Sequence, residues 1–551
     1  MKGNSSIMKK TILVLSLVSV GAFLGMFINT AISGDNIYEQ LKKFQYVYNV
    51  AYRNYVIEKT PEELNEAAIR GLLGGLDVHS VYIDKEEMEK VSENFSGEFE
   101  GIGIEFDMVE DTIIVVSPIK GGPSEELGIM AGDKIVKIDD EDAVGMNRSE
   151  VPKKLKGPKG TKVAVDIKRE GQKKLIHFDI IRDKIPIETV DANYMIDDEI
   201  GYVTINRFAA NTHEEMIKAV NELKQQGMKK LILDLRGNPG GYLTQAFYMA
   251  DEFLKGGDTI VYTEGRLPEF NEMFESSERG TLKDIPLIVM VDAGSASASE
   301  IVSGAIQDLD RGLIVGETSY GKGLVQRQYD LGDGSAFRLT ISYYYTPSGR
   351  SIQRPFKDKD EYRNLVGRLE LDEGANLQHS LESLMKEKGK DKINMDSIPI
   401  FYTRKGRKVL GGGGITPDYI VKRDTNRLTE TVVDMRMKRI FYDFTYEFLR
   451  GDAGTKFKAK YENNFNDFYK NFEITDAMVK RAVEISKSKE IEVKDEDIKK
   501  DKDFIKVALK STIAKIVWDS NKQMQVSSVL DRQLKKAKTL FNEAIKISSL
   551  K

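Results

Sequence analysis

Two short, uninterrupted apolar runs constrain the fold of this chain most. Residues 287 to 291 read Leu-Ile-Val-Met-Val and residues 313 to 316 read Leu-Ile-Val-Gly, and each run has the length of a strand. Between them, an Ala-Gly-Ser turn at 293 to 295 is followed by apolar residues at helical spacing, Ile301, Ala305 and Leu309. This order predicts two buried parallel strands joined by a helix that begins near Ser297, and therefore an α/β core.

Two reactive side chains should meet at one edge of this sheet. Ser297 lies at the expected helix start, where unpaired N–H groups favour negative charge. Lys322 lies in a Gly-Lys-Gly loop after the second strand, at the same carboxyl edge. Serine and neutral lysine form a nucleophile and base without histidine. Burial would have to lower the lysine pKa by about 3, and Gln326 would orient the amine without adding charge.

Each of these residues also has a plainer interpretation. Ser297 to Glu300 fits a capping box, so Ser297 also suits a simple helix N-cap. Lys322 by itself is typical of a solvated loop lysine. Spacing alone does not choose among Ser295, Ser297 and Ser299 as the nucleophile.

The loop around Lys322 is also a near match to a phosphate-binding loop. Its pattern runs from Gly316 to Lys322, but Gly323 stands where a Ser or Thr would hold magnesium. The acidic strand that ends at Asp234 lies upstream of the loop, the reverse of the usual order. An NTPase therefore stays an alternative that the sequence disfavours.

Three stretches of the chain resemble the carboxyl-terminal processing proteases, also called tail-specific proteases. They are Gly-Ser-Ala-Ser-Ala-Ser-Glu-Ile at 294 to 301, the pair at 307 to 308, and Tyr-Gly-Lys-Gly-Leu-Val-Gln at 320 to 326. The resemblance implies that Ser297 is the nucleophile, that Lys322 is the base, that Gln326 supports it and that Asp308 is functionally important. It implies a serine endopeptidase that works through an acyl-enzyme without a cofactor.

A glycine turn follows another predicted strand of the core. Residues 230 to 235 form the strand, and Arg-Gly-Asn-Pro-Gly-Gly follows at 236 to 241. Such a turn presents bare backbone N–H groups, as an oxyanion hole requires. The segment resembles the family loop that donates one oxyanion N–H, so we expect Gly240 to donate it, with Gly241 as second choice. Ala298 would supply the other N–H, and a plain turn remains the alternative.

Short strands and glycine turns occupy residues 97 to 183, and this stretch is similar to a PDZ domain of the bacterial protease type. Successive N–H groups at Gly101, Ile102, Gly103 and Ile104 would capture a terminal carboxylate while the peptide adds as a strand to the sheet edge. An apolar pocket beside them would prefer an apolar terminal residue. The alternative is that the two glycines only permit a tight turn.

The length of 551 residues exceeds one domain. We expect a signal peptide or membrane anchor at 1–35, an N-terminal helical region at 36–95, a PDZ domain at 96–184, a protease core at 185–422 and a C-terminal α-helical domain at 423–551. The core would hold a parallel-rich mixed sheet and a charged insertion at about 356–398. The C-terminal helices would stabilise the core, form a dimer or restrict which substrates enter.

The N-terminal segment predicts export from the cytoplasm. Lys2, Lys9 and Lys10 precede an uncharged apolar run from 11 to 32 that is long enough to span a bilayer as a helix. The positive flank stays inside, so the remaining chain would face outward. A small-residue sequence at 31 to 33 also suits signal cleavage, and secretion into the cell envelope space is the alternative.

Composition excludes several other classes. The 82 Lys and Arg against 87 Asp and Glu give a net charge of −5, which indicates no basic face for nucleic acid. The absence of cysteine excludes disulfides and thiol chemistry, and no pair of the four histidines has metal-ligand spacing.

His213 is typical of an exposed helix start rather than of a catalytic base. We expect protein C-termini as substrates, no metal, and a homodimer as one form of assembly. An inactive PDZ scaffold is the remaining alternative, which the intact set of Ser297, Lys322 and Gln326 disfavours.

Overall fold

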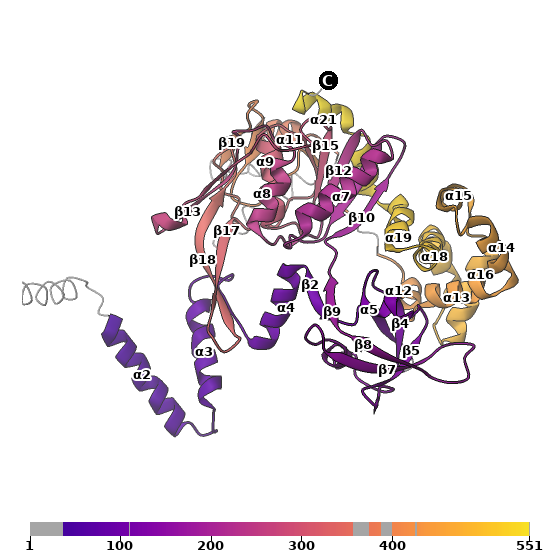
Figure 1. Cartoon of the computed structure of the whole chain (residues 1–551). Helices are drawn as coiled ribbons and strands as arrows, with labels where there is room; N and C mark the ends of the chain where they lie inside the picture. Colours follow the sequence, from indigo (N-terminus) through magenta and orange to yellow (C-terminus); the bar gives the residue numbers. More distant parts are fainter. Residues whose placement is uncertain (1–36, 110, 356–373, 387–398, 425–426, 550–551) are drawn as a thin grey trace, which may run out of the picture. The chain divides into compact units, whose positions relative to one another are not determined.

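The computed structural model describes residues 37–109, 111–355, 374–386, 399–424 and 427–549 (Figure 1). These residues divide into two compact units: one holds the described residues up to Asp84 together with Gln328–Leu339, and the other holds Lys85–Arg327 and the residues from Thr340 on. The predicted signal peptide or anchor at 1–35 lies outside the described residues. None of the described helices combines the length and apolar composition needed to cross a membrane.

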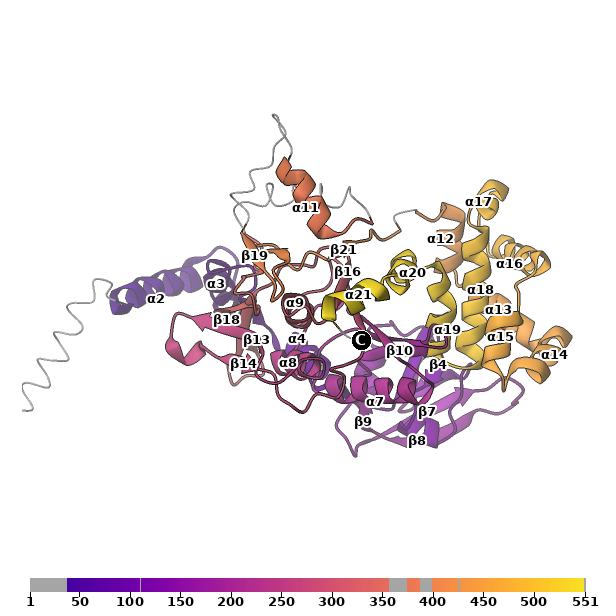
Figure 2. The same ribbon diagram turned by 90° about the horizontal axis from the view of Figure 1, so that it is seen from above.

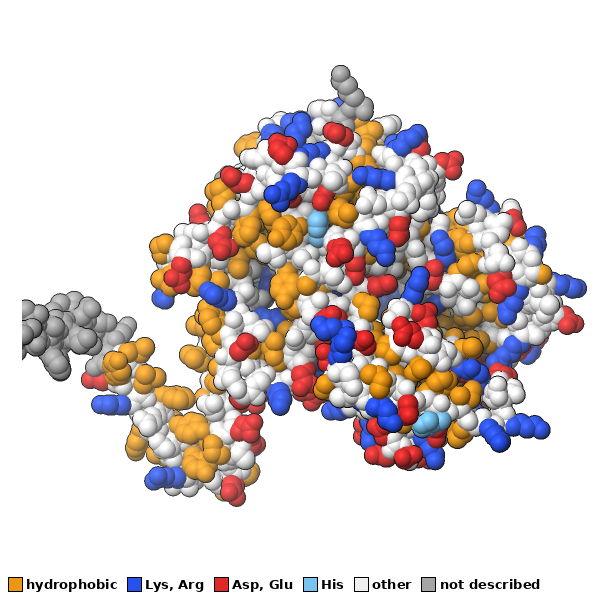
Figure 3. Space-filling model, viewed as in Figure 1, with side chains coloured by type: hydrophobic (Ala, Val, Ile, Leu, Met, Phe, Trp, Pro, Cys, Tyr) orange, Lys and Arg blue, Asp and Glu red, His pale blue; other side chains and the backbone are white. Residues whose placement is uncertain are grey.

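The first unit contains the N-terminal helices. α2 (Ile37–Asn54) precedes α3 (Pro61–Gly74), which starts with a capping box between Thr60 and Glu63. β1 (Val81–Ile83) pairs antiparallel with residues Ala336–Arg338 at the start of β18 (Ala336–Tyr345). Hydrophobic side chains gather along α2 (Figure 3), where the exposed ones include Ile37, Leu41, Phe44, Val47 and Val50.

A six-stranded sheet forms the centre of the second unit. Its order is β10 (Val190–Met195), β11 (Ile200–Ile205), β12 (Lys230–Asp234), β15 (Leu287–Val291), β16 (Leu313–Gly316) and β21 (Tyr419–Ile420). β10 runs antiparallel to β11, and all other neighbours are parallel. The two apolar runs singled out in the sequence are thus adjacent parallel strands.

Helices cover both faces of this sheet (Figure 2). α7 (Thr212–Gln225), α8 (Leu243–Asp251) and α9 (Ala298–Asp308) pack on the face that receives Leu287, Val289 and Val291. α20 (Arg532–Lys538) and α21 (Phe541–Ser548) pack on the opposite face, against Ile288 and Met290. Because both faces are buried, the central strands read as continuous apolar runs rather than as alternating patterns.

A second six-stranded sheet lies between residues 104 and 181. Its order is β3 (Ile104–Val109), β4 (Thr112–Pro118), β5 (Lys134–Ile138), β7 (Lys162–Lys168) and β8 (Ile176–Ile181), with β6 (Glu141–Asp142) also on β5. Two short helices, α5 (Pro123–Glu126) and α6 (Val151–Leu155), lie in the connections between its strands. The strand that precedes the sheet in the chain, β2 (Glu98–Gly101), pairs antiparallel with the strand that follows it, β9 (Asp183–Pro186). The strand β3 stands at one end of the sheet.

The remaining elements of the second unit before residue 424 are short. They are α4 (Lys85–Ser96), β13 (Thr259–Gly265), the 3-10 turn η1 (Pro268–Phe270), β14 (Met273–Glu275), β19 (Ile400–Tyr402) and β20 (Lys408–Leu410), together with the first residues of β17 (Leu324–Asp330), whose last three belong to the first unit. Residues 342–345 of β18 pair with β13. Of the predicted charged insertion at 356–398, the described part contains α11 (Leu377–Lys386).

The stretch predicted as one C-terminal helical domain contributes to two separate apolar cores. One core is built by α12 (Glu430–Met437), α13 (Ile440–Arg450), α14 (Asp452–Tyr461), α15 (Phe465–Asn471), α16 (Asp476–Ser488), α17 (Asp495–Lys500), α18 (Lys502–Val517) and α19 (Ser520–Ser527), with the 3-10 turn η3 (Ser528–Leu530) after them. Its centre is aromatic, with Phe457 packed edge-on against Phe468, Phe472 and Trp518. From Leu534 onward the chain instead packs on the face of the central sheet that presents Ile288 and Met290.

We expect Phe541→Ala to lower the free energy of unfolding by about 3–5 kcal/mol, because the ring is buried against the central sheet. Urea unfolding of the full chain measures this. Asn542→Ala, at the exposed next position of the same helix, should change it by less than about 0.5 kcal/mol. Equal, small effects of the two substitutions would contradict the assignment of α21 to this core.

Candidate active site

Ser297 lies at the sharp turn between β15 and α9. Its backbone has φ 53° and ψ −111°, outside the usual regions for a residue with a side chain, which costs roughly 1–3 kcal/mol. Ser295 and Ser299 are fully buried, and their hydroxyls donate to the carbonyls of Leu235 (2.8 Å) and Asn238 (3.0 Å). Ser297 is partly exposed. Of the three serines in this run, Ser297 is therefore the one that a substrate can reach.

The buried carboxylate of Glu300 connects the serine to the lysine loop. It accepts the backbone N–H groups of Ser297 (2.8 Å), Gly321 (2.7 Å) and Lys322 (2.9 Å), and the hydroxyl of Ser319 (2.5 Å). Burial raises the pKa of Glu300, and the four donors act in the opposite direction. The expected capping interaction from Glu300 to Ser297 is present, and the same carboxylate also fixes a loop more than twenty residues away.

Tyr344 on β18 makes a second link between the same two residues. Its phenol oxygen lies 2.7 Å from the carbonyl oxygen of Lys322 and 3.1 Å from that of Ser297. The side chain is buried, and burial raises the pKa of the phenol well above its usual range. Tyr344 therefore stays a hydrogen-bond donor, and it holds the two backbone segments side by side.

Lys322 lies in the loop between β16 and β17, and its side chain is partly exposed. Its Nζ donates to Oε1 of Gln326, at 2.7 Å. The amide is a neutral acceptor, so it orients the amine without the electrostatic penalty on deprotonation that a carboxylate would bring. The loop leads into the strand β17, whereas a phosphate-binding loop leads into a helix N-terminus, which argues against the NTPase alternative.

The glycine turn after β12 lies against Ser297. Gly240 has φ 97°, and a Cβ at this position would stand 2.8 Å from Cβ of Ser297 and 2.9 Å from N of Ala298. The N–H of Gly240 donates to Oδ1 of the buried Asn238, at 2.9 Å. Among the hydrogen bonds of the described residues, no acceptor is assigned to the N–H groups of Gly241 and Ala298. In this conformation Gly241, the second choice from sequence, is thus the glycine whose N–H is available.

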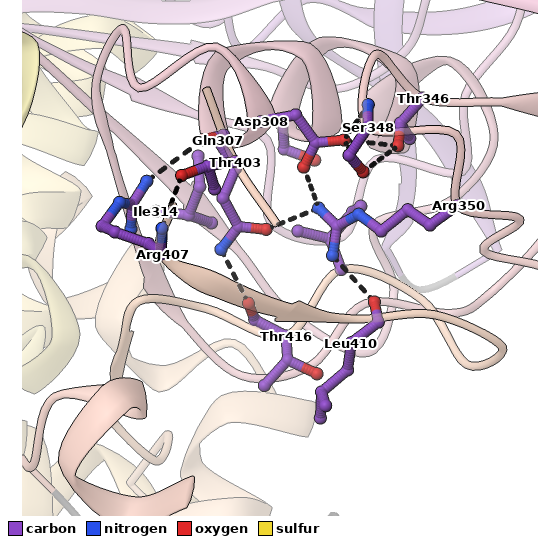
Figure 4. Close-up of polar contacts among 12 residues, drawn as sticks. Gln307, Asp308, Ile314, Thr346, Ser348, Arg350, Thr403, Arg407, Leu410 and Thr416 are labelled. Carbon is purple, nitrogen blue, oxygen red and sulfur yellow. Dashed lines mark hydrogen bonds and ion pairs between the residues drawn. The ribbon is translucent and has the colours of Figure 1, made fainter. Parts of the chain in front are cut away.

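Asp308, expected to be functionally important, has no contact with the reacting groups among its described partners. Its carboxylate forms an ion pair with Arg350 (2.7 Å), both side chains being fully buried, and accepts the hydroxyls of Thr346 (2.5 Å) and Ser348 (2.7 Å). Gln307 accepts from the same guanidinium, at 2.7 Å. Figure 4 shows Arg350 reaching toward Gln307 and Asp308 at the end of α9. Asp308 thereby anchors the loop after Tyr344 to the helix that begins at Ser297.

The histidine at the start of α7 stands apart from this constellation. His213 pairs through Nε2 with Oε1 of Glu252, at 3.0 Å. Across the described residues, no group of three or more His, Cys, Asp or Glu side chains is arranged to hold a metal ion.

Comparison with known proteins identifies the family. The peptidase family S41 model matches residues 199–361, a PDZ domain model matches 101–180, and a family of unknown function matches 431–519. The carboxy-terminal-processing protease of Bartonella bacilliformis is 39% identical over 58% of this chain and 74% of its own length. The carboxy-terminal processing protease CtpA of Bacillus subtilis is 36% identical over 62% and 72%, respectively.

The chain belongs to the carboxy-terminal processing proteases. The resemblance read from the sequence motifs is confirmed, and so is the PDZ domain. Among solved structures, a photosystem II D1 C-terminal processing protease has 27% identity and a TM-score of 0.32, over 56% of this chain and 83% of that one.

The PDZ domain of this carboxy-terminal processing protease carries the expected glycine turn. Gly103 has φ 73°, and the carbonyl of the buried Ile102 accepts both the N–H (3.1 Å) and the hydroxyl (2.6 Å) of Ser124. Gly101 ends β2, and Ile104 begins β3. Within the described part of the chain, β3 pairs only with β4, so its other edge has no strand partner.

Three residues of the protease site were not singled out by sequence reasoning in the roles they have. Glu300 carries a visible capping signal, but its bonds to the lysine loop depend on tertiary structure. Tyr344 lies in an alternating strand and Asn238 in a glycine turn, and neither pattern marks them. The three residues act on backbone groups, so no chemical motif of reactive side chains could have identified them.

We expect Glu300→Gln to lower kcat/KM by about 10- to 100-fold. In the amide, an NH2 group replaces one of the two carboxylate oxygens. At least one of the four donors then loses its acceptor and faces another donor, which costs about 1.5–3 kcal/mol. Ser319→Ala, which removes one donor and leaves the carboxylate, should lose less activity. A Glu300→Gln enzyme as active as the Ser319→Ala enzyme would contradict this role.

Proposed function

We propose that this chain is a serine endopeptidase that shortens the C-terminal tails of other proteins, with Ser297 as nucleophile and Lys322 as general base. The observation that carries the proposal is that Glu300 and Tyr344 each contact the backbones of both residues. The hydrogen bond from Lys322 to the neutral Gln326 supports it, and so do the names of the curated relatives.

The proposed reaction has two halves. Neutral Lys322 takes the hydroxyl proton of Ser297 as the oxygen attacks the scissile carbonyl, and the N–H groups of Gly241 and Ala298 stabilise the oxyanion. The peptide C–N bond then breaks, and protonated Lys322 returns the proton to the leaving amine. Water, deprotonated by the same amine, attacks the acyl-enzyme ester and releases the shortened chain with Ser297 restored. No cofactor takes part in this scheme.

The proposed substrates are unstructured tails with an apolar C-terminal residue. The tail would add as a strand to the edge of β3 that has no strand partner among the described residues, and its carboxylate would bind the N–H groups of the turn at 101 to 104. The proposal includes an outward-facing enzyme, tethered by the N-terminal segment or secreted into the cell envelope space, because such a location follows from the charges around residues 11 to 32. A homodimer remains part of the proposal through the apolar surface of α2.

The competing proposal of an inactive scaffold is tested by covalent labelling. We expect a fluorophosphonate probe to label the full chain, and Ser297→Ala to abolish both labelling and cleavage of an unfolded protein such as casein. Ser299→Ala changes a buried serine in the same run and should keep the label. Equal labelling of wild type and Ser297→Ala would contradict the assignment of the nucleophile.

Gln326→Glu tests the state of the lysine. A carboxylate in place of the amide oxygen that accepts from Nζ favours the charged amine and raises its pKa. We expect kcat/KM at neutral pH to fall at least about 10-fold, and its rise with pH to move upward by about 1 or more. The measurement is a kcat/KM profile against pH, with Gln328→Glu, an exposed position of the same strand, as the matched control. Superimposable profiles for the two variants would exclude Lys322 as the base.

Recognition of the terminus is tested with matched peptides. A peptide with an apolar residue and a free C-terminal carboxylate should be cleaved with a KM about 10-fold or more below that of its C-terminal amide, because the amide lacks the charge that the turn N–H groups bind. Kinetics on the pair with the full chain measure this. Equal KM values would exclude carboxylate capture.

A further inference from the structure

Arg236 ties the glycine turn to the end of the chain. Its Nη2 lies 2.5 Å from Asp234 Oδ2 and 2.6 Å from Asp531 Oδ2, and its Nη1 lies 2.7 Å from Gln533 Oε1. The side chain of Arg236 is only 18% exposed. Although burial opposes its charge, Asp234 and Asp531 together raise the pKa of Arg236 above its usual value. One arginine therefore joins the carboxyl end of β12 to a segment almost 300 residues later.

The partners from the C-terminal segment are themselves held in place. Asp531 caps α20 by accepting the N–H of Leu534 at 2.9 Å, and Gln533 donates to the carbonyl of Val421 at 2.6 Å. Leu534 is buried on the face of the central sheet that presents Ile288 and Met290. Asp531 and Gln533 thus present fixed acceptors to Arg236.

Arg236 is also connected to the nucleophile through a short path. Two residues on, Asn238 accepts the N–H of Ala296 through its carbonyl (2.9 Å) and the N–H of Gly240 through Oδ1 (2.9 Å). On the other side, the phenol of Tyr202 donates to Asp234 at 2.7 Å. The turn that lies against Ser297 is therefore fixed at both its start and its middle.

We propose that Asp531, with Gln533, is a positioning residue of the protease: it holds Arg236 and thereby sets the glycine turn against Ser297 for oxyanion binding. The inference rests on the proposed function. A planar guanidinium with acceptors on two sides cannot rotate without breaking an ion pair, so the turn keeps one geometry. Removal of the Asp531 charge leaves Arg236 with one ion pair, to Asp234, and with the neutral acceptor Gln533, so the start of the turn is held less firmly. The loss should appear in the chemical step rather than in substrate capture.

Asp531→Asn is the sharpest test, because asparagine is an equally good N-cap and keeps the start of α20 intact. In the full chain, with a fluorogenic peptide that ends in an apolar residue, we expect kcat to fall about 10-fold or more with KM within 2-fold of wild type. A peptide boronate that binds the reactive serine should lose about 10-fold in affinity. Asp531→Glu, which restores the charge, should recover part of the kcat. Lys538→Met removes another ion pair of α20 to the core, to Asp197 at 2.9 Å, and should leave all three quantities unchanged.

The outcomes separate the two proposals. An active wild type whose Asp531→Asn variant retains kcat and boronate affinity overturns this inference alone, whereas a wild type that neither cleaves nor reacts with fluorophosphonate overturns both. If Asp531→Asn lowers the unfolding temperature more than Lys538→Met does, a double-mutant cycle of Asp531→Asn with Arg236→Lys separates the positioning role from a general loss of stability. Asp531→Asn that adds no further loss of kcat in the Arg236→Lys background supports the positioning role, and additive losses contradict it.

Discussion

A single buried carboxylate joins the backbones of Ser297 and Lys322, the two residues of the proposed catalytic pair. Glu300 has about four acceptor sites, and four donors occupy them: three backbone N–H groups, including those of Ser297 and Lys322, and one hydroxyl. A charge that is fully buried requires such satisfaction, since each missing donor leaves it uncompensated. The helix that begins after the serine and the loop that bears the lysine are therefore fixed relative to each other by the same requirement.

The rest of the core supports this arrangement in layers. Helices on both faces of the central sheet keep the carboxyl ends of β12, β15 and β16 at one edge, where the glycine turn, the serine and the lysine loop follow in that order. The close approach of Gly240 to Ser297 leaves no room for a side chain. At the far end of α9, the buried pair of Asp308 and Arg350 fixes the loop that follows Tyr344. Backbone geometry at the site is thus controlled from several directions.

Local patterns were sufficient to predict the parts of the fold whose signals are local. The two apolar runs, the turn and the helical spacing after it predict β15, α9 and β16, and the PDZ domain came from the resemblance of the strands and glycine turns of 97 to 183 to that domain type. The motif resemblance separated Ser297 from its two neighbours, and the structure supplies the physical difference in their burial. Contacts between distant segments were not predictable: the bonds of Glu300 to Gly321, of Asp308 to Arg350 and of α21 to the central sheet join residues that no periodicity connects.

The same carboxylate bears on the chemistry of the lysine. A negative charge near an amine favours its protonated form, which cannot act as a base. Glu300 lies close to the backbone of Lys322, but its oxygens are occupied by N–H groups and by Ser319, while the amine donates to the neutral Gln326. The charge of Glu300 is spread over dipoles that point at it, so its field at the amine is reduced. A carboxylate can therefore assemble the proposed site without holding the proton on Lys322, the proposed base.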